Sequence, residues 1–142
     1  MKGKKKDDVN VKHLTISQSK SNGVSGYQGM SFHLFHLNIE KSEDSGVGVS
    51  DTKRNTMSNC QVSHSKDSGV KVQNGLITIN GSGTSIHNNV TGGSSDCYGL
   101  YTYNSDASIH LVSPLTKESV SINNGGGQNY GSPYGGTIKT ID

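Results

Sequence analysis

The sequence has little apolar material and lacks the features of a membrane-spanning or disulfide-stabilised protein. Its 142 residues include no tryptophan, two prolines and two cysteines, and only 29% of them are hydrophobic. No apolar run approaches the ~20 residues that a membrane helix needs, and two cysteines do not make a disulfide framework. An ordinary globular core of this size would need more apolar side chains than this chain supplies.

Charge and the N-terminus exclude further classes of protein. The net charge of +2 is too small to indicate a nucleic-acid partner. Four lysines lie within Met1–Lys6, but no hydrophobic stretch follows them, so this start does not have the pattern of a secretory signal. We therefore expect residues 1–10 to form a flexible basic lead-in. We also expect neither a nucleic acid nor a membrane as partner, and a cytoplasmic or virion-associated location.

What the sequence does contain is an internal repeat. The segments that begin at Leu14, Leu37 and Cys60 align without a gap, each at the same distance along the chain from the one before. The residues that share a column are Leu14, Leu37 and Cys60; Ile16, Ile39 and Val62; Ser19, Ser42 and Ser65; and Gly23-Val24, Gly46-Val47 and Gly69-Val70. A fixed period of about 23 residues is typical of a solenoid, in which stacked coils share a thin apolar column.

Each coil is predicted to hold about three short strands separated by polar corners. Leu14 and Ile16 alternate with polar residues, as in a strand with one buried face. Gly23 is expected to supply backbone freedom at the next corner, before a second strand opens at Val24. A third strand begins near Met30, and the pattern then repeats.

The later coils are less regular. Coil four is predicted to begin near Ile86, and residues 91–98 are expected to bulge from a corner as a surface loop. Coil five is predicted to begin at Ile109, one repeat period after Ile86, with its second strand at Val120 and Ile122. The Gly/Asn-rich segment 123–136 then precedes a last strand at residues 137–141.

These columns and corners, over residues 11–122, resemble the right-handed parallel β-helix superfamily, which includes pectate-lyase-like proteins and β-helix proteins of phages and viruses. The resemblance implies an all-β domain over residues 11–142, a right-handed single-chain solenoid of five to six coils. It specifies the fold much better than an activity. No polygalacturonase or pectate-lyase motif is present in the sequence.

Asp44 and Asp67 are the sharpest chemical candidates. They share a column, and adjacent coils lie about 4.8 Å apart, so the two carboxylates should stack. One interpretation is a catalytic pair of a glycoside hydrolase. The resemblance implies a second, a Ca²⁺ site as in polysaccharide lyases of this fold; otherwise no cofactor is expected. A third is that both aspartates cap their own turns and that the nearby Lys20 and Lys66 neutralise the pair.

A second candidate site lies beside the predicted surface loop. Tyr101 and Tyr103 alternate with apolar or small residues and should share the outward face of a strand. With Tyr98 and the loop residue Asp96, they are expected to form a ligand-binding platform on which sugar rings stack. An oligomer interface is the alternative for the same exposed tyrosines.

Histidines and the single arginine add little to the chemistry. His13 and His36 are one repeat period apart, as are His87 and His110, so each pair is expected to stack on adjacent coils. No third ligand recurs with either pair, so no metal site is predicted. The resemblance implies that a lyase of this superfamily needs a basic residue, usually Arg or Lys, to remove the sugar proton. The single arginine, Arg54, lies in the polar third segment of coil two, whose strand pattern is weak.

The sequence therefore favours a non-enzymatic structural or binding module. Such a protein would bind a glycan, for example a polysaccharide, or assemble through its exposed faces. The alternative is a carbohydrate-active enzyme, a polysaccharide lyase or glycoside hydrolase, which a groove beside Asp44 and Asp67 would favour. Because five coils bury little and leave both ends open, a homo-oligomer is expected, with a trimer favoured.

Overall fold

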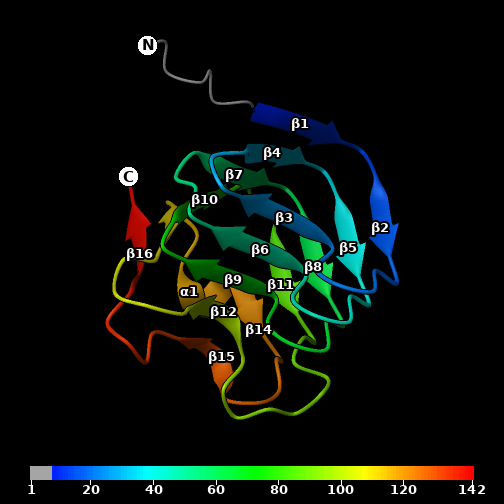
Figure 1. Ribbon diagram of the computed structural model, residues 1–142, viewed down its shortest axis with the longest axis vertical. Coiled ribbons are helices and arrows are strands. Elements are labelled where there is room, and N and C mark those ends of the chain that lie inside the picture. Colours follow the sequence, from blue (N-terminus) through cyan, green and yellow to red (C-terminus); the bar gives the residue numbers. More distant parts are fainter. Residues whose placement is uncertain (1–7) are drawn as a thin grey trace.

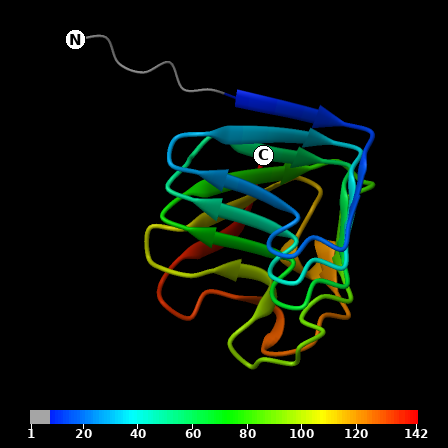
Figure 2. The same cartoon turned by 45° about the vertical axis from the view of Figure 1, so that its right-hand side comes forward.

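The computed structural model describes residues 8–142 and shows three parallel sheets that wind around one core (Figures 1 and 2). Sheet A contains β1 (Asp8–Lys12), β4 (Ser31–Phe35), β7 (Asn55–Ser58), β10 (Leu76–Asn80), β13 (Ser108–Val112) and β16 (Thr137–Ile141). Sheet B contains β2 (Thr15–Ser17), β5 (Asn38–Glu40), β8 (Gln61–Ser63), β11 (Ser85–His87) and β14 (Ser121–Ile122). Sheet C contains β3 (Val24–Tyr27), β6 (Val47–Ser50), β9 (Val70–Gln73), β12 (Tyr98–Thr102) and β15 (Gln128–Gly131).

The repeat columns coincide with the register of the sheets. Ile16 pairs with Ile39, Ile39 with Val62, and Val62 with Ile86. In sheet C the corresponding column is Val24, Val47, Val70 and Leu100. These side chains point inward and, apart from those of the first coil, are buried. The predicted solenoid with three strands in each coil is confirmed.

The winding begins earlier than the sequence predicted. β1 starts at Asp8, so residues 8–10 belong to a paired strand and not to a flexible lead-in. Val9 and Val11 alternate in this strand and register with Phe32 and Leu34 of β4, which explains why the segment is ordered. The rest of the predicted lead-in lies outside the described residues.

Non-glycine residues in the left-handed backbone region turn the corners. His13, His36 and Asn59 have φ of 52°, 56° and 50° at equivalent positions of successive coils. A second such column is Gln18, Lys41, His64, Asn88 and Asn123. Gly23 and Gly46 do not have positive φ. The expectation that Gly23 supplies backbone freedom at its corner is therefore wrong, and close packing explains the glycine instead.

The last two coils depart from the predicted register. Ile109 pairs with Ile77 in sheet A, so it belongs to the third strand of coil four and does not start coil five. Val120 ends a short helix, α1 (Lys117–Val120), and Ile122 lies in β14 of sheet B. The Gly/Asn-rich segment contains a strand, β15, that pairs with β12. The last strand is confirmed as β16, and residues 91–97 form the predicted exposed loop.

A polar ladder runs inside the corner between sheets B and C. In the later coils it consists of Asn89 and Asn124, whose side-chain amides donate to the carbonyls of Val62 and Ile86. In the earlier coils Ser42 and Ser65 occupy this column, and their buried hydroxyls have no hydrogen-bond partner among the described residues. Serine is too short to make the contacts that asparagine makes here.

No helix in residues 8–142 is long and apolar enough to cross a membrane.

Candidate functional site

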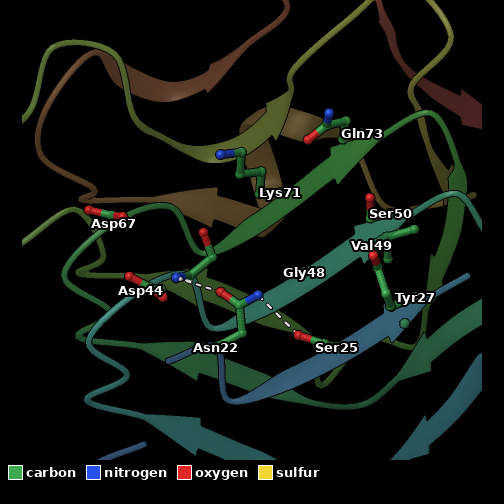
Figure 3. A pocket seen from close by; sticks show the side chains of 12 residues that line it. Asn22, Ser25, Tyr27, Asp44, Gly48, Val49, Ser50, Asp67, Lys71 and Gln73 are labelled. Atoms are coloured by element: carbon green, nitrogen blue, oxygen red, sulfur yellow. Dashed lines mark hydrogen bonds between the residues drawn. The ribbon is translucent and has the colours of Figure 1, made fainter. Parts of the chain in front are cut away.

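A groove lies on the outer face of sheet C, across β3, β6 and β9 (Figure 3). Its volume is about 560 Å³. Its lining consists of Asn22, Ser25, Gly26, Tyr27, Asp44, Ser45, Gly48, Val49, Ser50, Asp67, Lys71 and Gln73. The side chains are mostly hydroxyls, amides and carboxylates, with one lysine and one tyrosine. The groove is therefore rich in hydrogen-bonding groups and is bounded by an aromatic ring.

The groove is hollow because a glycine interrupts an outward column. Gly48 pairs with Ser25 on one side and Lys71 on the other, so a side chain is missing at the centre of the sheet. Asn22 lies over this gap, where a Cβ on Gly48 would approach its Nδ2 atom to 2.5 Å. The Asn22 side chain is fixed, because its Nδ2 donates to Ser25 Oγ (3.0 Å) and its Oδ1 accepts from Ser45 N (3.0 Å).

Asp44 and Asp67 both line this groove, at the corners that precede β6 and β9. Asp67 N donates to the carbonyl oxygen of Asp44 at 3.3 Å, so the two residues stack as the repeat predicted. Asp44 Oδ2 also accepts from Ser21 Oγ at 3.1 Å. Figure 3 shows both carboxylates at one end of the groove and Tyr27 at the other, with Lys71 between them. Their chemical role stays a prediction.

The neighbouring lysines are arranged differently from what the sequence indicated. Lys20 Nζ lies 3.0 Å from Glu43 Oε1 and binds that carboxylate. Among the described residues, neither Asp44 nor Asp67 has an ion pair. The positive charge that shares the groove with them is that of Lys71, which was not predicted from the sequence.

The predicted platform of Tyr98, Tyr101 and Tyr103 is a packed cluster. The Tyr98 and Tyr101 rings are 5.2 Å apart and tilted by 49°, whereas Tyr101 and Tyr103 meet edge to face at 5.9 Å. Tyr101 points away from the core but is only 5% exposed. The Lys71 ammonium lies over Tyr103 at 4.9 Å from the ring centre. Of the two alternating tyrosines, Tyr103 is therefore the one whose ring remains exposed.

Asp96 lies apart from this cluster. It is exposed in the loop of residues 91–97, where its backbone nitrogen donates to Ser94 Oγ at 3.3 Å. It is not among the residues that line the groove. The structure therefore brings Asp44, Asp67 and Lys71 into the groove but leaves Asp96 outside it.

Because Tyr101 is buried, the free energy of unfolding is expected to fall at alkaline pH. Burial raises the pKa of Tyr101 from its ordinary value of 10.0 to about 12, and the nearby Tyr134 and Tyr103 add to the effect. The neutral phenol is thus favoured in the folded chain. This stabilisation is complete below pH 10 and is lost as the pH rises toward 12. Because one pKa unit is worth ~1.4 kcal/mol, the loss approaches ~2 kcal/mol.

Urea unfolding at about pH 8 and about pH 11 measures this effect. Tyr101→Phe removes the titrating group but keeps the ring, so its loss of stability between the two pH values should be smaller than that of the unchanged protein. Equal losses in the two proteins would show that Tyr101 does not contribute.

Arg54 and the histidines lie elsewhere. Arg54 binds Asp8 of β1, with Nη2 3.0 Å from Oδ1, and is not part of the groove. The stacking of His13 on His36 is confirmed, with ring centres 5.0 Å apart and planes within 3°. The predicted stacking of His87 on His110 is wrong, because His87 lies in sheet B and His110 in sheet A. The loop insertion accounts for this error, since it breaks the constant spacing of the repeat.

Calcium fits the described residues poorly. Ca²⁺ takes six to eight oxygen ligands, whereas Asp44 and Asp67 supply two carboxylates, one of which already accepts from Ser21. Within residues 8–142 there is no group of three or more His, Cys, Asp or Glu residues placed to hold a metal ion. Two carboxylates supply at most about four of these oxygens, so a calcium site at Asp44 and Asp67 stays a prediction.

Three parallel sheets with this winding define a parallel β-helix. Comparison with known protein families matches residues 1–128 to the family described as "Right handed beta helix region". The chain therefore belongs to the right-handed β-helix family. Neither the curated proteins nor the solved structures provide a match to the chain.

Sequence reasoning missed most of the groove. Asn22, Tyr27, Gly48, Lys71 and Gln73 line it, yet none of them was singled out in the sequence. One signal was present: the alignment of the repeats puts Gly48 in the same column as Ser25 and Lys71. A glycine between two longer outward residues marks a hollow in a parallel sheet.

Proposed function

We propose that the protein is a non-enzymatic binding module that takes a glycan in the groove on sheet C. The supporting observation is the lining of that groove, which combines an exposed tyrosine with carboxylates, amides and hydroxyls. A sugar offers hydroxyls that both donate and accept, and C–H faces that pack on aromatic rings. Tyr27 is 55% exposed at one end of the groove and is free to cover such a face.

The polar groups are suited to orientation of a sugar. Gln73 offers both a donor and an acceptor, Lys71 offers donors only, and the two aspartates accept when ionised. Asn22 is already held by Ser25 and Ser45 and therefore serves as a fixed wall. The lining is more polar than that of the usual small-ligand site, which suits a ligand rich in hydroxyl groups.

A plugged groove tests this proposal. Ser50 is half-buried at the edge of the groove, on the outer face of β6. Ser50→Trp should fill the groove and reduce binding of any glycan that the unchanged protein binds on a glycan array by at least about tenfold. The matched control is Gln61→Trp, which places the same side chain on the exposed face of sheet B. Equal binding by both variants would exclude the groove as the site.

One observation favours a second function, a polysaccharide lyase. Lys71 shares the groove with Asp44 and Asp67, so a base and two carboxylates lie in one site. In a lyase the lysine would remove the proton beside the uronate carboxylate, and the glycosidic oxygen would leave as a double bond forms. Polygalacturonate with Ca²⁺, followed by the ultraviolet absorbance of the unsaturated product, tests it. Turnover that Lys71→Met abolishes would replace the binding-module proposal with the lyase.

A further inference from the structure

Exposed large apolar side chains gather at the two ends of the solenoid. Seven such residues occur in the described chain, and six of them lie in the first turn of the winding or in its last segments. Those near the start are Val9, Leu14, Tyr27 and Met30, and those near the end are Ile122 and Tyr134. Val9 and Leu14 share inward columns with Phe32 and Leu37, which are buried, so their exposure is that expected where a further coil is missing. Tyr27 and Ile122 lie instead on outer faces, opposite Ser50 and His87.

Within residues 8–142, the strands at the two ends of the stack each have an unpaired edge, and they come in matching order. One end consists of β1, β2 and β3, which are the terminal strands of sheets A, B and C. The other end consists of β16, β14 and β15, the opposite terminal strands of the same three sheets. Figure 2 shows β1 at one extreme of the stack and the loop before β12 near the other. Unpaired edges of this kind are templates for pairing with another chain.

We propose that copies of this chain associate end to end, with β16, β14 and β15 of one copy docked on β1, β2 and β3 of the next. This contact does not rest on glycan binding. It continues all three parallel sheets across the junction, and it differs from a trimer held by lateral faces. Because the two surfaces are different, the assembly is heterologous and grows in steps without closing.

The inward-facing residues of sheet A stay in register across such a junction. Within the chain, Ile109 pairs with Ile138, and Leu111 with Thr140. At the other end Val9 pairs with Phe32, and Val11 with Leu34. Extension of the register by one coil therefore puts Ile138 against Val9 of the next copy and Thr140 against its Val11.

The hydrogen-bonding groups agree with the same register. Thr137 N donates to Ala107 O and Ser113 N donates to Ile141 O, so alternate residues of β16 face β13. The N–H and C=O groups of Ile138 and Thr140 then face outward. In β1, His13 N donates to Phe35 O, so by the same alternation the groups of Asp8, Asn10 and Lys12 face outward. Ile138 opposite Val9 is the alignment in which these two free edges bond.

Charge does not select this register. Lys139 lies opposite Asn10 of the next copy and diagonal to both its Asp8 and its Lys12, and Asp8 is already bound by Arg54. Contact between two identical β1 ends fits less well, because a two-fold axis that pairs β1 with β1 lays the three-residue β2 against the four-residue β3.

Proline substitution at each end tests the proposal with the full chain. Asn10→Pro and Thr140→Pro each remove one outward N–H and leave the pairing with β4 or β13 intact, since proline is tolerated on strand edges. Asn10→Thr and Thr140→Val are the matched controls that keep the N–H; Thr140→Val also lacks the hydroxyl that Thr140 donates to Leu115 O. Circular dichroism and thermal unfolding confirm that each variant folds.

Light scattering across a concentration series provides the measurement. The unchanged protein and both controls should show a mass that rises steadily above the 15.0 kDa of one chain. Each proline variant alone should stay at that mass. Their equimolar mixture should give a species of twice that mass and nothing larger, because only one intact junction is available.

Three results would overturn the proposal. Self-association retained by Thr140→Pro alone would show contact between two β1 ends. Association retained by both proline variants would show a lateral interface. A constant mass of one chain for the unchanged protein, up to the highest concentration that stays soluble, would show that the ends do not pair.

Discussion

Gly46→Ala should destabilise the protein by ~2–3 kcal/mol, a large part of the ~5–15 kcal/mol that holds a typical domain together. A Cβ at position 46 would run into Val62 Cγ1 and would lie 2.9 Å from both the carbonyl oxygen of Gly69 and Ser65 Oγ. All three residues belong to the next coil and are buried in the stack. The coils approach too closely here for a side chain.

Urea unfolding measures this change, and Gly83→Ala is the control. Gly83 lies in an exposed turn, where an added Cβ meets Asn59 Oδ1 at 3.2 Å and a flexible side chain can move. Its variant should change stability by less than ~1 kcal/mol. If Gly46→Ala were as stable as Gly83→Ala, the close stacking of coils two and three would be wrong.

Asn89→Ala should cost about 3 kcal/mol, because one buried side chain satisfies several backbone groups at once. Asn89 is 2% exposed. Its Oδ1 accepts from Ser65 N at 3.1 Å, and its Nδ2 donates to Val62 O at 3.0 Å and to Asn124 Oδ1 at 3.1 Å. Removal of the amide leaves the nitrogen of Ser65 and the carbonyl of Val62 buried without this partner. Thermal and urea unfolding report the loss.

Ser65→Asn provides the converse test. Ser65 occupies the same column one coil earlier, and its buried hydroxyl has no partner in the described chain. An asparagine there can repeat the contacts of Asn89, so we expect a gain of about 1 kcal/mol. Destabilisation by Ser65→Asn together with no effect of Asn89→Ala would show that the polar ladder does not stabilise the coils.

The fold was predictable because the first three coils repeat without a gap. Their constant spacing determined which residues share a column, and Ile16, Ile39 and Val62 do pair in sheet B. Cys60 follows Leu14 and Leu37 in another such column and is fully buried, as its position predicted. Burial also raises the pKa of its thiol.

The later coils were not predictable from spacing. The loop of residues 91–97 lengthens one coil, so Ile109, although it follows Ile86 by one repeat period, lies in a different sheet. β15 was missed because its sequence, QNYG, has one large apolar residue and no alternation. It is held by pairing with β12 and by the packing of Tyr130 on the core.

The candidate site was predicted only in part. Stacking in a column brought Asp44 and Asp67 together, which sequence spacing is able to show. The groove beside them depends on which outward side chains are absent and on where the side chains of the neighbouring corners lie. Gly48 and Asn22 define it through a contact between coils, and a pattern of apolar residues carries no information about such a contact. The prediction of a trimer stays a prediction.

Chemical-shift mapping would test most directly whether the groove on sheet C binds the ligand. A glycan that binds on an array would be added to the isotopically labelled protein while the backbone amides are followed. If the groove is the site, the shifts should concentrate at Ser25, Gly48, Lys71 and Gln73, with sheets A and B unchanged. Shifts confined to sheet A or sheet B, with those four amides unmoved, would contradict it.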